Sequence, residues 1–356
     1  MFHDKMTSKE RMKAYVEGKE VDRLPCFPLL GESGASLFDV KLSEYYWDPK
    51  KLSHVEIETF KMFQGDGVDI STGLKGIGEA LGAKVAYPQD NLCMLTEPSI
   101  KDYSDIDGLD VINPYKDGRL PILLNAMELT LEAVDDEANV SAGIAGPMSV
   151  AASIIGTERL MKDIRKNPEG VWKVLDLSVQ SNLVYVEAVH REFGIPIGIG
   201  DPVASMSLMS KATFHKYALP FLSELVDGII RITGKKPSLH ICGKTKAIWE
   251  YLPLLNISSF SVDNVEDLSE LREAIGDRLM IIGNIKPVET LYQGTKEEVI
   301  AESKRCIDIA IDSPNGYALA PGCQIPVGTN PENIIAMLDT ARTYGKNAKI
   351  GKKASA

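Results

Sequence analysis

The sequence has few cysteines, no long apolar run and too few basic residues to balance its acidic ones. Five cysteines among 356 residues form an odd and sparse set, so we expect reduced thiols and no disulfide framework. No run of about 18 apolar residues occurs, and the N-terminus lacks the apolar core of a signal peptide, so we expect a cytoplasmic protein without a membrane segment. The formal net charge of −11 opposes binding to nucleic acid and to anionic membrane surfaces.

What the sequence does contain is typical of a large globular fold. Apolar residues make up 44% and charged residues 25%, which provides for a sizeable core. Short apolar or β-branched runs alternate with longer stretches of helical periodicity, the pattern of βα units. Eight runs qualify as strands: 24–30, 67–71, 139–145, 195–200, 237–242, 258–262, 279–284 and 317–320. We therefore predict an α/β fold, a single (β/α)8 TIM barrel.

Helical segments are predicted between these strands, and one stretch breaks the alternation. The expected helices are 160–166, 168–193, 211–233, 244–252, 265–275, 296–313 and 331–344, with an N-terminal helix over 8–18 that braces one end of the barrel. Residues 73–138, between the second and third strands, are interpreted as an insertion with a hairpin that folds over one end of the barrel. The barrel domain is expected to span 1–345, followed by a flexible tail over 346–356.

Two short motifs place three metal donors at strand ends. His240-Ile241-Cys242-Gly243 ends one apolar run, where alternation puts His240 and Cys242 on the same face. Ala320-Pro321-Gly322-Cys323 ends another run. Taken singly, each half is more typical of core residues than of a metal site, since a buried cysteine is commonly an inert small hydrophobe. Together, one imidazole and two thiolates favour zinc with an open fourth position, which is the arrangement of catalytic sites.

Other side chains also follow the predicted strands, where barrels of this kind carry their chemistry. Asp201 follows a glycine-containing strand and is expected either to act in catalysis or to cap a turn. Asp263 is expected to be a further oxygen ligand or to polarise His240. The candidates for substrate binding are Glu32, Met148, Met206, Lys244, Asn284 and Tyr317.

Several stretches together carry a resemblance to a known family. They are 18–25, 200–205 with 208–210, 240–244, and 319–323 with 331–334. With these, the chain resembles the uroporphyrinogen decarboxylase superfamily, and within it the zinc-containing, corrinoid-dependent methyltransferases. The decarboxylases hold substrate carboxylates with an arginine-rich N-terminal segment, whereas residues 27–32 here contain no arginine. The resemblance thus argues against porphyrinogen decarboxylation.

The resemblance implies zinc on His240, Cys242 and Cys323, and methyl transfer between a substrate heteroatom and the cobalt of a corrinoid that a separate protein carries. Asp263 stands where the family has a glutamate, which leaves a fourth protein ligand open. It also implies an enzyme, with a corrinoid-binding protein as partner and a small methyl donor or acceptor as substrate; the oligomeric state stays open.

Two directions of transfer are open. We expect a demethylase-type first step, from a methoxylated aromatic ether to the corrinoid, because residues that flank the strand ends, Phe27, Met148, Met206 and Tyr317, are apolar. The alternative is transfer from methylcobalamin to a thiol such as coenzyme M. The sulfonate of coenzyme M calls for a cation near the zinc, and the lysines form no obvious cluster in the sequence. A non-catalytic zinc scaffold would instead need a closed site with four ligands.

Overall fold

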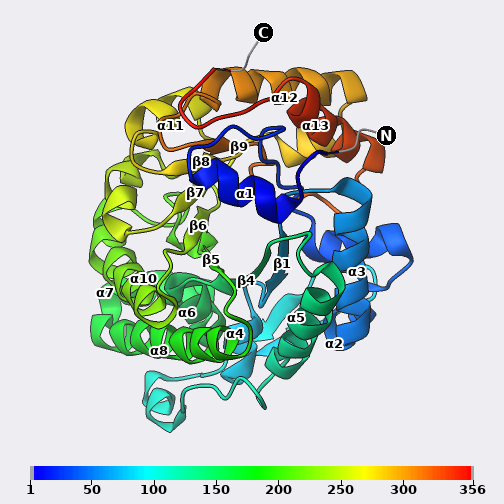
Figure 1. Ribbon diagram of the computed structural model, residues 1–356. Helices are drawn as coiled ribbons and strands as arrows, with labels where there is room; N and C mark the ends of the chain where they lie inside the picture. Colours follow the sequence, from blue (N-terminus) through cyan, green and yellow to red (C-terminus); the bar gives the residue numbers. More distant parts are fainter. Residues whose placement is uncertain (1–3, 354–356) are drawn as a thin grey trace.

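The computed structural model describes residues 4–353 and contains a curled, all-parallel sheet of seven strands surrounded by helices (Figure 1). The strand order is β1-β4-β5-β6-β7-β8-β9, so each strand lies beside its successor in the sheet. The strands are β1 Val68–Ser71, β4 Val140–Ala145, β5 Ile197–Gly200, β6 Ser238–Ile241, β7 Ser259–Val262, β8 Met280–Ile282 and β9 Tyr317–Ala318. Parallel order of this kind places all carboxyl ends at one edge.

The first of the eight predicted strands, 24–30, does not form. Pro25 and Pro28 interrupt it, and proline has no N–H to give to a ladder. The segment still lies in line with the sheet: Cys26 forms a parallel bridge with Leu319, and the Cys26 carbonyl accepts from the Asp66 N–H at 3.0 Å. The other predicted strands match observed ones to within a few residues.

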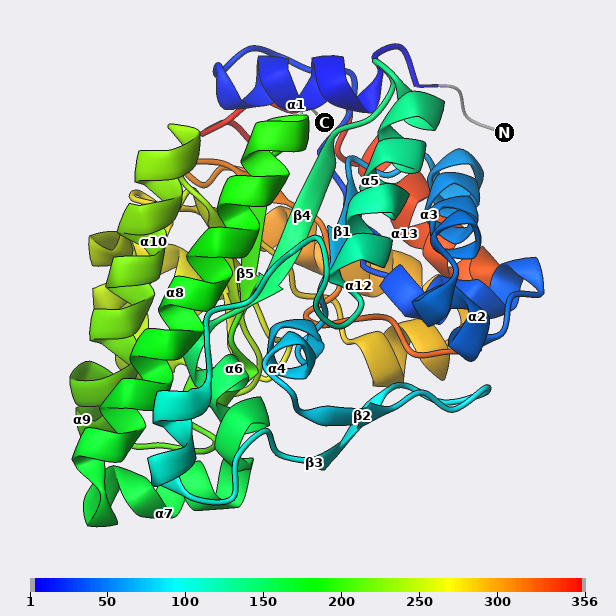
Figure 2. The same ribbon diagram turned by 90° about the horizontal axis from the view of Figure 1, so that it is seen from below.

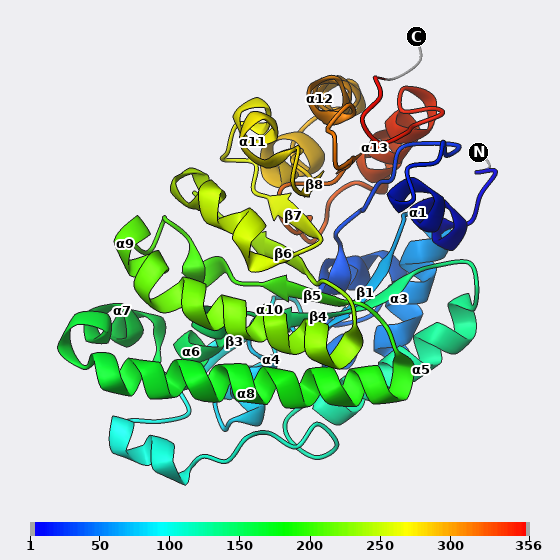
Figure 3. The same cartoon turned by 60° about the vertical axis from the view of Figure 1, so that its left-hand side comes forward.

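Helices cover the outer face of the sheet, and α8 and α10 lie side by side there (Figure 3). The helices on this face and around the ring are α1 Ser8–Val16, α3 Pro49–Phe63, α6 Pro147–Ile155, α7 Thr157–Lys166, α8 Pro168–Phe193, α9 Lys211–Thr213, α10 Leu219–Thr233, α11 Leu268–Ile275, α12 Lys296–Ala310 and α13 Pro331–Thr343. The prediction for α8 is confirmed in full, because both of its ends are marked: the Asn167 side chain accepts from the Gly170 N–H, and Gly194 adopts φ 63°. Across residues 4–353, no helix is both long and apolar enough to cross a membrane.

Two predicted helices differ from the observed ones. The segment predicted over 211–233 contains a π-helical turn over Phe214–Ala218 between α9 and α10. Pro220, just beyond this turn, cannot donate the usual i→i−4 hydrogen bond, which explains why the regular pattern is disturbed there. The segment predicted over 244–252 forms a 3-10 helix over Lys246–Leu255 that contains Pro253.

The stretch 73–138 contains a hairpin, as predicted, two α-helices and a 3-10 helix over Tyr103–Gly108. α4 (Gly76–Ala80) follows β1, then β2 (Lys84–Ala86) pairs antiparallel with β3 (Met94–Glu97), and α5 (Leu120–Val134) packs on α3. Figure 2 shows the hairpin at one end of the barrel and α1 at the other. The hairpin is therefore at the end to which the carboxyl end of β1 leads.

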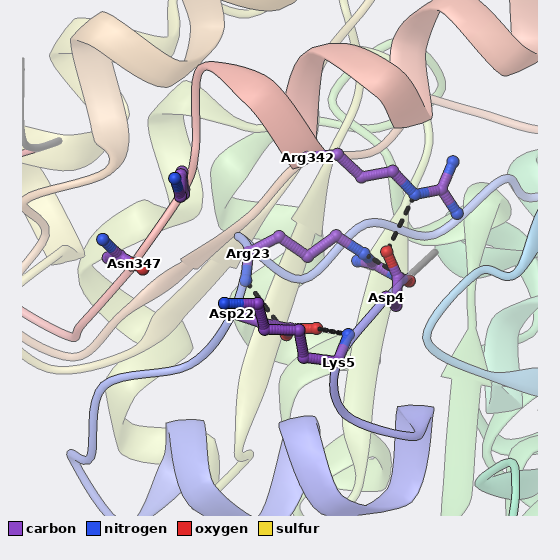
Figure 4. A pocket seen from close by; sticks show the side chains of 7 residues that line it. Asp4, Lys5, Asp22, Arg23, Arg342 and Asn347 are labelled. Atoms are coloured by element: carbon purple, nitrogen blue, oxygen red, sulfur yellow. Dashed lines mark hydrogen bonds and ion pairs between the residues drawn. The ribbon is translucent and has the colours of Figure 1, made fainter. Parts of the chain in front are cut away.

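Buried charges join the elements at the amino-terminal end of the barrel. The Asp66 side chain is inaccessible to solvent; it accepts from Arg11 Nη1 at 2.7 Å, from Arg23 Nη1, and from the Cys26 N–H at 2.7 Å. Asp4 accepts from Arg23 Nε at 2.8 Å and from Arg342 Nε at 2.9 Å (Figure 4). This ion-pair network ties α1, the 22–26 segment and α13 to the start of β1.

The chain after residue 345 packs against the same end. The Val21 N–H donates to the Ala348 carbonyl at 2.9 Å, and the backbones of Arg23 and Lys346 form an isolated antiparallel β-bridge. Ala348 is 2% exposed. Packed structure therefore extends past the expected boundary at residue 345, and residues 354–356 lie outside the described part of the chain.

Replacing Asp66 with alanine should lower the free energy of unfolding by about 3 to 5 kcal/mol, because two buried arginines lose their shared counter-charge. Urea denaturation followed by far-UV circular dichroism measures this. Asp136→Ala is the matched control, since Asp136 pairs with Lys9 on the surface; its midpoint should not change. Equal midpoints for both variants would contradict a stabilising role for the network.

Candidate metal centre

The backbone of two neighbouring strands sets the orientation of His240. His240 on β6 is in register with Ser261 on β7, and its Nδ1 lies 3.1 Å from the Ser261 carbonyl and 3.0 Å from Ser261 Oγ. With the ring proton on Nδ1 donated to that carbonyl, Nε2 keeps its lone pair for a metal. Ser261 is not among the residues predicted from the sequence, because its register opposite His240 becomes visible only with the sheet.

The three predicted metal ligands meet in the structure. His240 Nε2 lies 3.0 Å from Cys242 Sγ, and Cys242 Sγ lies 3.5 Å from Cys323 Sγ. All three donor atoms lie within 4.8 Å of one another, and both cysteines are free and half-buried. Donors from positions about eighty residues apart thus converge on a volume that suits one ion.

The two sulfurs lie within hydrogen-bond distance of each other. The hydrogen bond from Cys242, with a smaller contribution from His240, lowers the pKa of Cys323 to about 4. The same hydrogen bond, together with burial, raises the pKa of Cys242. A thiolate beside a thiol is the arrangement in which a divalent cation displaces the remaining proton. The residues present therefore fit a zinc ion, which prefers imidazole and thiolate donors.

Asp263 lies next to this group but does not join it. Its Oδ2 accepts from the Gly243 N–H at 2.6 Å and its Oδ1 from the Val265 N–H at 3.0 Å. Gly243 has φ +74°, so the chain turns sharply just after Cys242. Both carboxylate oxygens are engaged with backbone, so Asp263 holds the loop that carries Cys242; its role as an oxygen ligand stays a prediction.

Asp201 caps a helix. It is inaccessible to solvent and accepts from Ser149 N–H at 2.9 Å, Ser149 Oγ at 2.6 Å and Met148 N–H at 3.2 Å, at the first turn of α6. Burial raises the pKa of Asp201 to about 6. A Cβ on Gly146 would lie 2.4 Å from the Asp201 Cβ, so a glycine is required there. Of the two roles considered for Asp201, the contacts are those of a cap.

Three of the predicted substrate-binding residues belong to the core. Met148 and Tyr317 are inaccessible to solvent, and the Tyr317 hydroxyl donates to the Gly283 carbonyl. Asn284 is 2% exposed and donates to the Asp263 carbonyl at 3.2 Å. Their position near strand ends in the sequence is explained by packing, so for these three the expected role is corrected.

The other three lie on loops at the carboxyl-terminal end. Glu32 is half-buried in a 3-10 turn over Gly31–Phe38, and Tyr46 Oη lies 3.5 Å from its carboxylate. The Met206 N–H donates to the Lys244 carbonyl at 2.9 Å, so the loops after β5 and β6 are adjacent. The Lys244 side chain is exposed. No contact among the described residues ties Lys244 to the metal donors.

The sheet's inner face, which we call the lumen, is lined by small residues. Val68 and Ile70 of β1 are buried on the side where α3 and α5 pack, so Asp69 and Ser71 face the lumen, and both are exposed. Four residues on neighbouring strands are in register with one another: Ser71, Gly143, Gly198 and Ser238. Two residues further along β5 and β6, Gly200 is in register with His240. Exposed side chains on the inner face of the curled sheet mean that solvent reaches the lumen. The sequence analysis missed Asp69.

A curled parallel sheet with a group of soft metal donors at the carboxyl ends of its strands is typical of barrel enzymes that hold a metal ion. The family model named Uroporphyrinogen decarboxylase (URO-D) matches residues 7–344, and the chain belongs to this family. The methylcobamide:CoM methyltransferase MtaA of Methanosarcina barkeri is 29% identical over 346 residues, covering 95% of this chain and 98% of the relative. The methylated-thiol–coenzyme M methyltransferase of Methanosarcina mazei is 24% identical over 335 residues, covering 93% and 88%.

A solved structure shows the same fold. It is described as a methyltransferase from Methanosarcina mazei, with a TM-score of 0.84 and 25% identity over 95% of this chain and 98% of that one. The predicted superfamily and the predicted class of enzyme, a methyltransferase, are confirmed by these relatives.

Loss of any of the three donors should abolish stable zinc binding. We expect about one zinc ion per purified chain, and markedly less for His240→Ala, Cys242→Ala and Cys323→Ala, measured by plasma mass spectrometry after dialysis. Cys306→Ala is the matched control, because Cys306 is buried elsewhere. Full zinc content in all three donor variants would rule out this centre.

Ser261→Ala should weaken zinc affinity by about tenfold, the low end for residues that orient a ligand, since the Ser261 carbonyl remains to hold Nδ1. Competition with a chromogenic chelator measures the affinity. Ser258→Ala, at a serine just before the same strand that contacts the Pro237 carbonyl, should bind zinc as the wild type does.

Proposed function

We propose that this chain is a zinc-dependent methyltransferase that moves a methyl group between a substrate heteroatom and the cobalt of a corrinoid carried by a partner protein. The observation that carries the proposal is the convergence of His240 Nε2, Cys242 Sγ and Cys323 Sγ within 4.8 Å. Relatives over nearly the full length are named as methyltransferases of this kind, which supports the same reading.

In this proposal the three donors would hold the zinc ion, which as a Lewis acid lowers the pKa of a thiol at its open position. The chain's own residues do the positioning. Ser261 fixes the ring of His240, and Asp263 fixes the turn after Cys242. The small residues of the lumen leave room for a substrate to approach the centre from within the barrel.

For the substrate we propose a thiol as methyl acceptor. The expectation of a methoxylated aromatic ether depended on apolar residues at the barrel mouth, and two of them, Met148 and Tyr317, are buried in the core. The thiol sulfur would form the new S–CH3 bond while the Co–C bond breaks. The electron pair of the Co–C bond would stay on cobalt, and the thiol proton would pass to solvent. The relatives named above act on coenzyme M, a thiol, according to their names.

We also propose that the segment around Cys26 completes an eight-membered barrel and that the whole chain forms one catalytic domain with residues 73–138 as its insertion. The hydrogen bonds from Phe27 to Leu319 and from Asp66 to Cys26 support the first point, since they link this segment to both neighbours. A barrel closed in this way would hold the metal donors at one rim.

Zinc-loaded protein should transfer methyl from free methylcobalamin to small thiols, which is measured by the change of the visible cobalamin spectrum under anaerobic conditions. Cys242→Ala and Cys323→Ala should lower kcat/KM by about 100-fold or more, because a Lewis acid worth several kcal/mol is lost. Cys306→Ala should retain the activity. Full activity in both donor variants would refute the mechanism.

The opposite direction is tested with cob(I)alamin and a panel of methoxylated aromatics, methanol and methylamines. We expect no methylcobalamin from the aromatic ethers. Its formation from them, without transfer to any thiol, would overturn the thiol proposal in favour of the demethylase-type reaction.

A further inference from the structure

The lumen differs from that of most barrels of this class, which is filled by layers of bulky branched side chains. Here five neighbouring strands contribute serine or glycine to it, in rows that the register joins. The inner face is thus polar and lined by small side chains on these strands, and the metal donor His240 lies on the same face of β6 as Ser238. Other side chains on that face border the space through which a substrate would reach the metal donors from within the barrel.

Asp69 is the charged side chain of β1 on this wall. It is in register with Ser141 of β4, and Ser141 Oγ donates to Asp69 Oδ1 at 2.7 Å. Its other oxygen, Oδ2, would lie 2.7 Å from a Cβ on Gly143, so a glycine at 143 makes room for this carboxylate. The side chain is nonetheless exposed, since it faces the open lumen.

No cation compensates this carboxylate. Among residues 4–353, no lysine, arginine or histidine forms an ion pair with Asp69. The charge that does act on it is that of Glu32, which is also negative. The surrounding walls of the lumen limit the hydration of this solvent-reached carboxylate and raise the pKa of Asp69 to about 6, so it is largely ionised at neutral pH, whereas burial raises the pKa of nearby Glu56 to about 8. The lumen therefore presents uncompensated negative charge to a bound molecule.

We propose that Asp69 is a specificity-determining residue, which selects a substrate with a positively charged group, such as an ammonium, at the end remote from the heteroatom that exchanges the methyl group. A sulfonate or carboxylate at that end would meet like charge in a site of reduced dielectric, which is unfavourable. This inference rests on the proposed function and names the substrate class of the same site. It predicts that this chain differs in acceptor from relatives named for coenzyme M.

Three thiols of equal length test the inference, because they differ only in the remote group: 2-aminoethanethiol, 2-mercaptoethanol and 2-mercaptoethanesulfonate. With zinc-loaded protein and methylcobalamin, kcat/KM should be highest for the ammonium thiol and at least about tenfold lower for the sulfonate. In Asp69→Asn, in which the amide oxygen still accepts from Ser141, the ratio of the ammonium to the sulfonate thiol should fall by about tenfold. Asp176→Asn, an exposed carboxylate on α8, should keep the wild-type ratio.

Preference for the sulfonate, or an unchanged ratio in Asp69→Asn, would overturn the inference while leaving methyl transfer itself intact. If no thiol is methylated, the proposed function fails instead, and charge selection is then decided by calorimetric binding of 2-aminoethanethiol and 2-mercaptoethanesulfonate to zinc-loaded wild type and Asp69→Asn. The inference is supported if the wild type binds the ammonium thiol more tightly than the sulfonate thiol and Asp69→Asn loses this preference. It is refuted if the wild type binds the two thiols equally.

Discussion

Cys323 meets His240 and Cys242 because β6, β7, β8 and β9 are parallel neighbours in one sheet. Their carboxyl ends must then lie along one rim, and the loops that follow are forced close together. A parallel bridge between Ile285 and Pro321 continues the ladder beyond the last regular pair. Just after it, a Cβ at position 322 would lie 2.3 Å from the Asn264 nitrogen, so Gly322 allows the loop after β9 to pass the loop after β7. The metal centre depends on this close passage.

The barrel separates stability from chemistry along its axis. At the amino-terminal end, Asp66 and Asp4 hold Arg11, Arg23 and Arg342 in a buried network that joins α1 to α13. At the carboxyl-terminal end, carboxylates serve loops instead: Asp201 holds the first turn of α6, and Asp263 holds the turn after Cys242. Such a division is common in this fold class, where the amino-terminal face serves stability.

Much of the fold could be predicted from the sequence, because its signals are local. The bounds of α8 follow from Asn167, Pro168 and Gly194, and His240 and Cys242 share a face by alternation alone. The role of Asp69 is different: an acidic residue in an apolar run is typical of a surface position, and its place in the lumen depends on which face the helices cover. Asp201 and Asp263 likewise bind backbone N–H groups 52 and 20 residues away, which the sequence does not place beside them. Tyr317 and Asn284 lie at strand ends as expected, but both side chains are buried and pack in the core.

The solvent-reached lumen has a consequence for how this protein responds to heat. Serine and glycine on the inner wall add little apolar burial, so the cohesion of the barrel comes from the layer between sheet and helices, where residues such as Val68, Ile70, Leu239 and Phe260 are buried. A molecule that fills the lumen adds contacts that the folded chain lacks by itself and the unfolded chain cannot make. Its free energy of binding is then added directly to that of folding. The midpoint of thermal unfolding thus becomes a readout of occupancy, by which ligands can be ranked without any knowledge of the reaction.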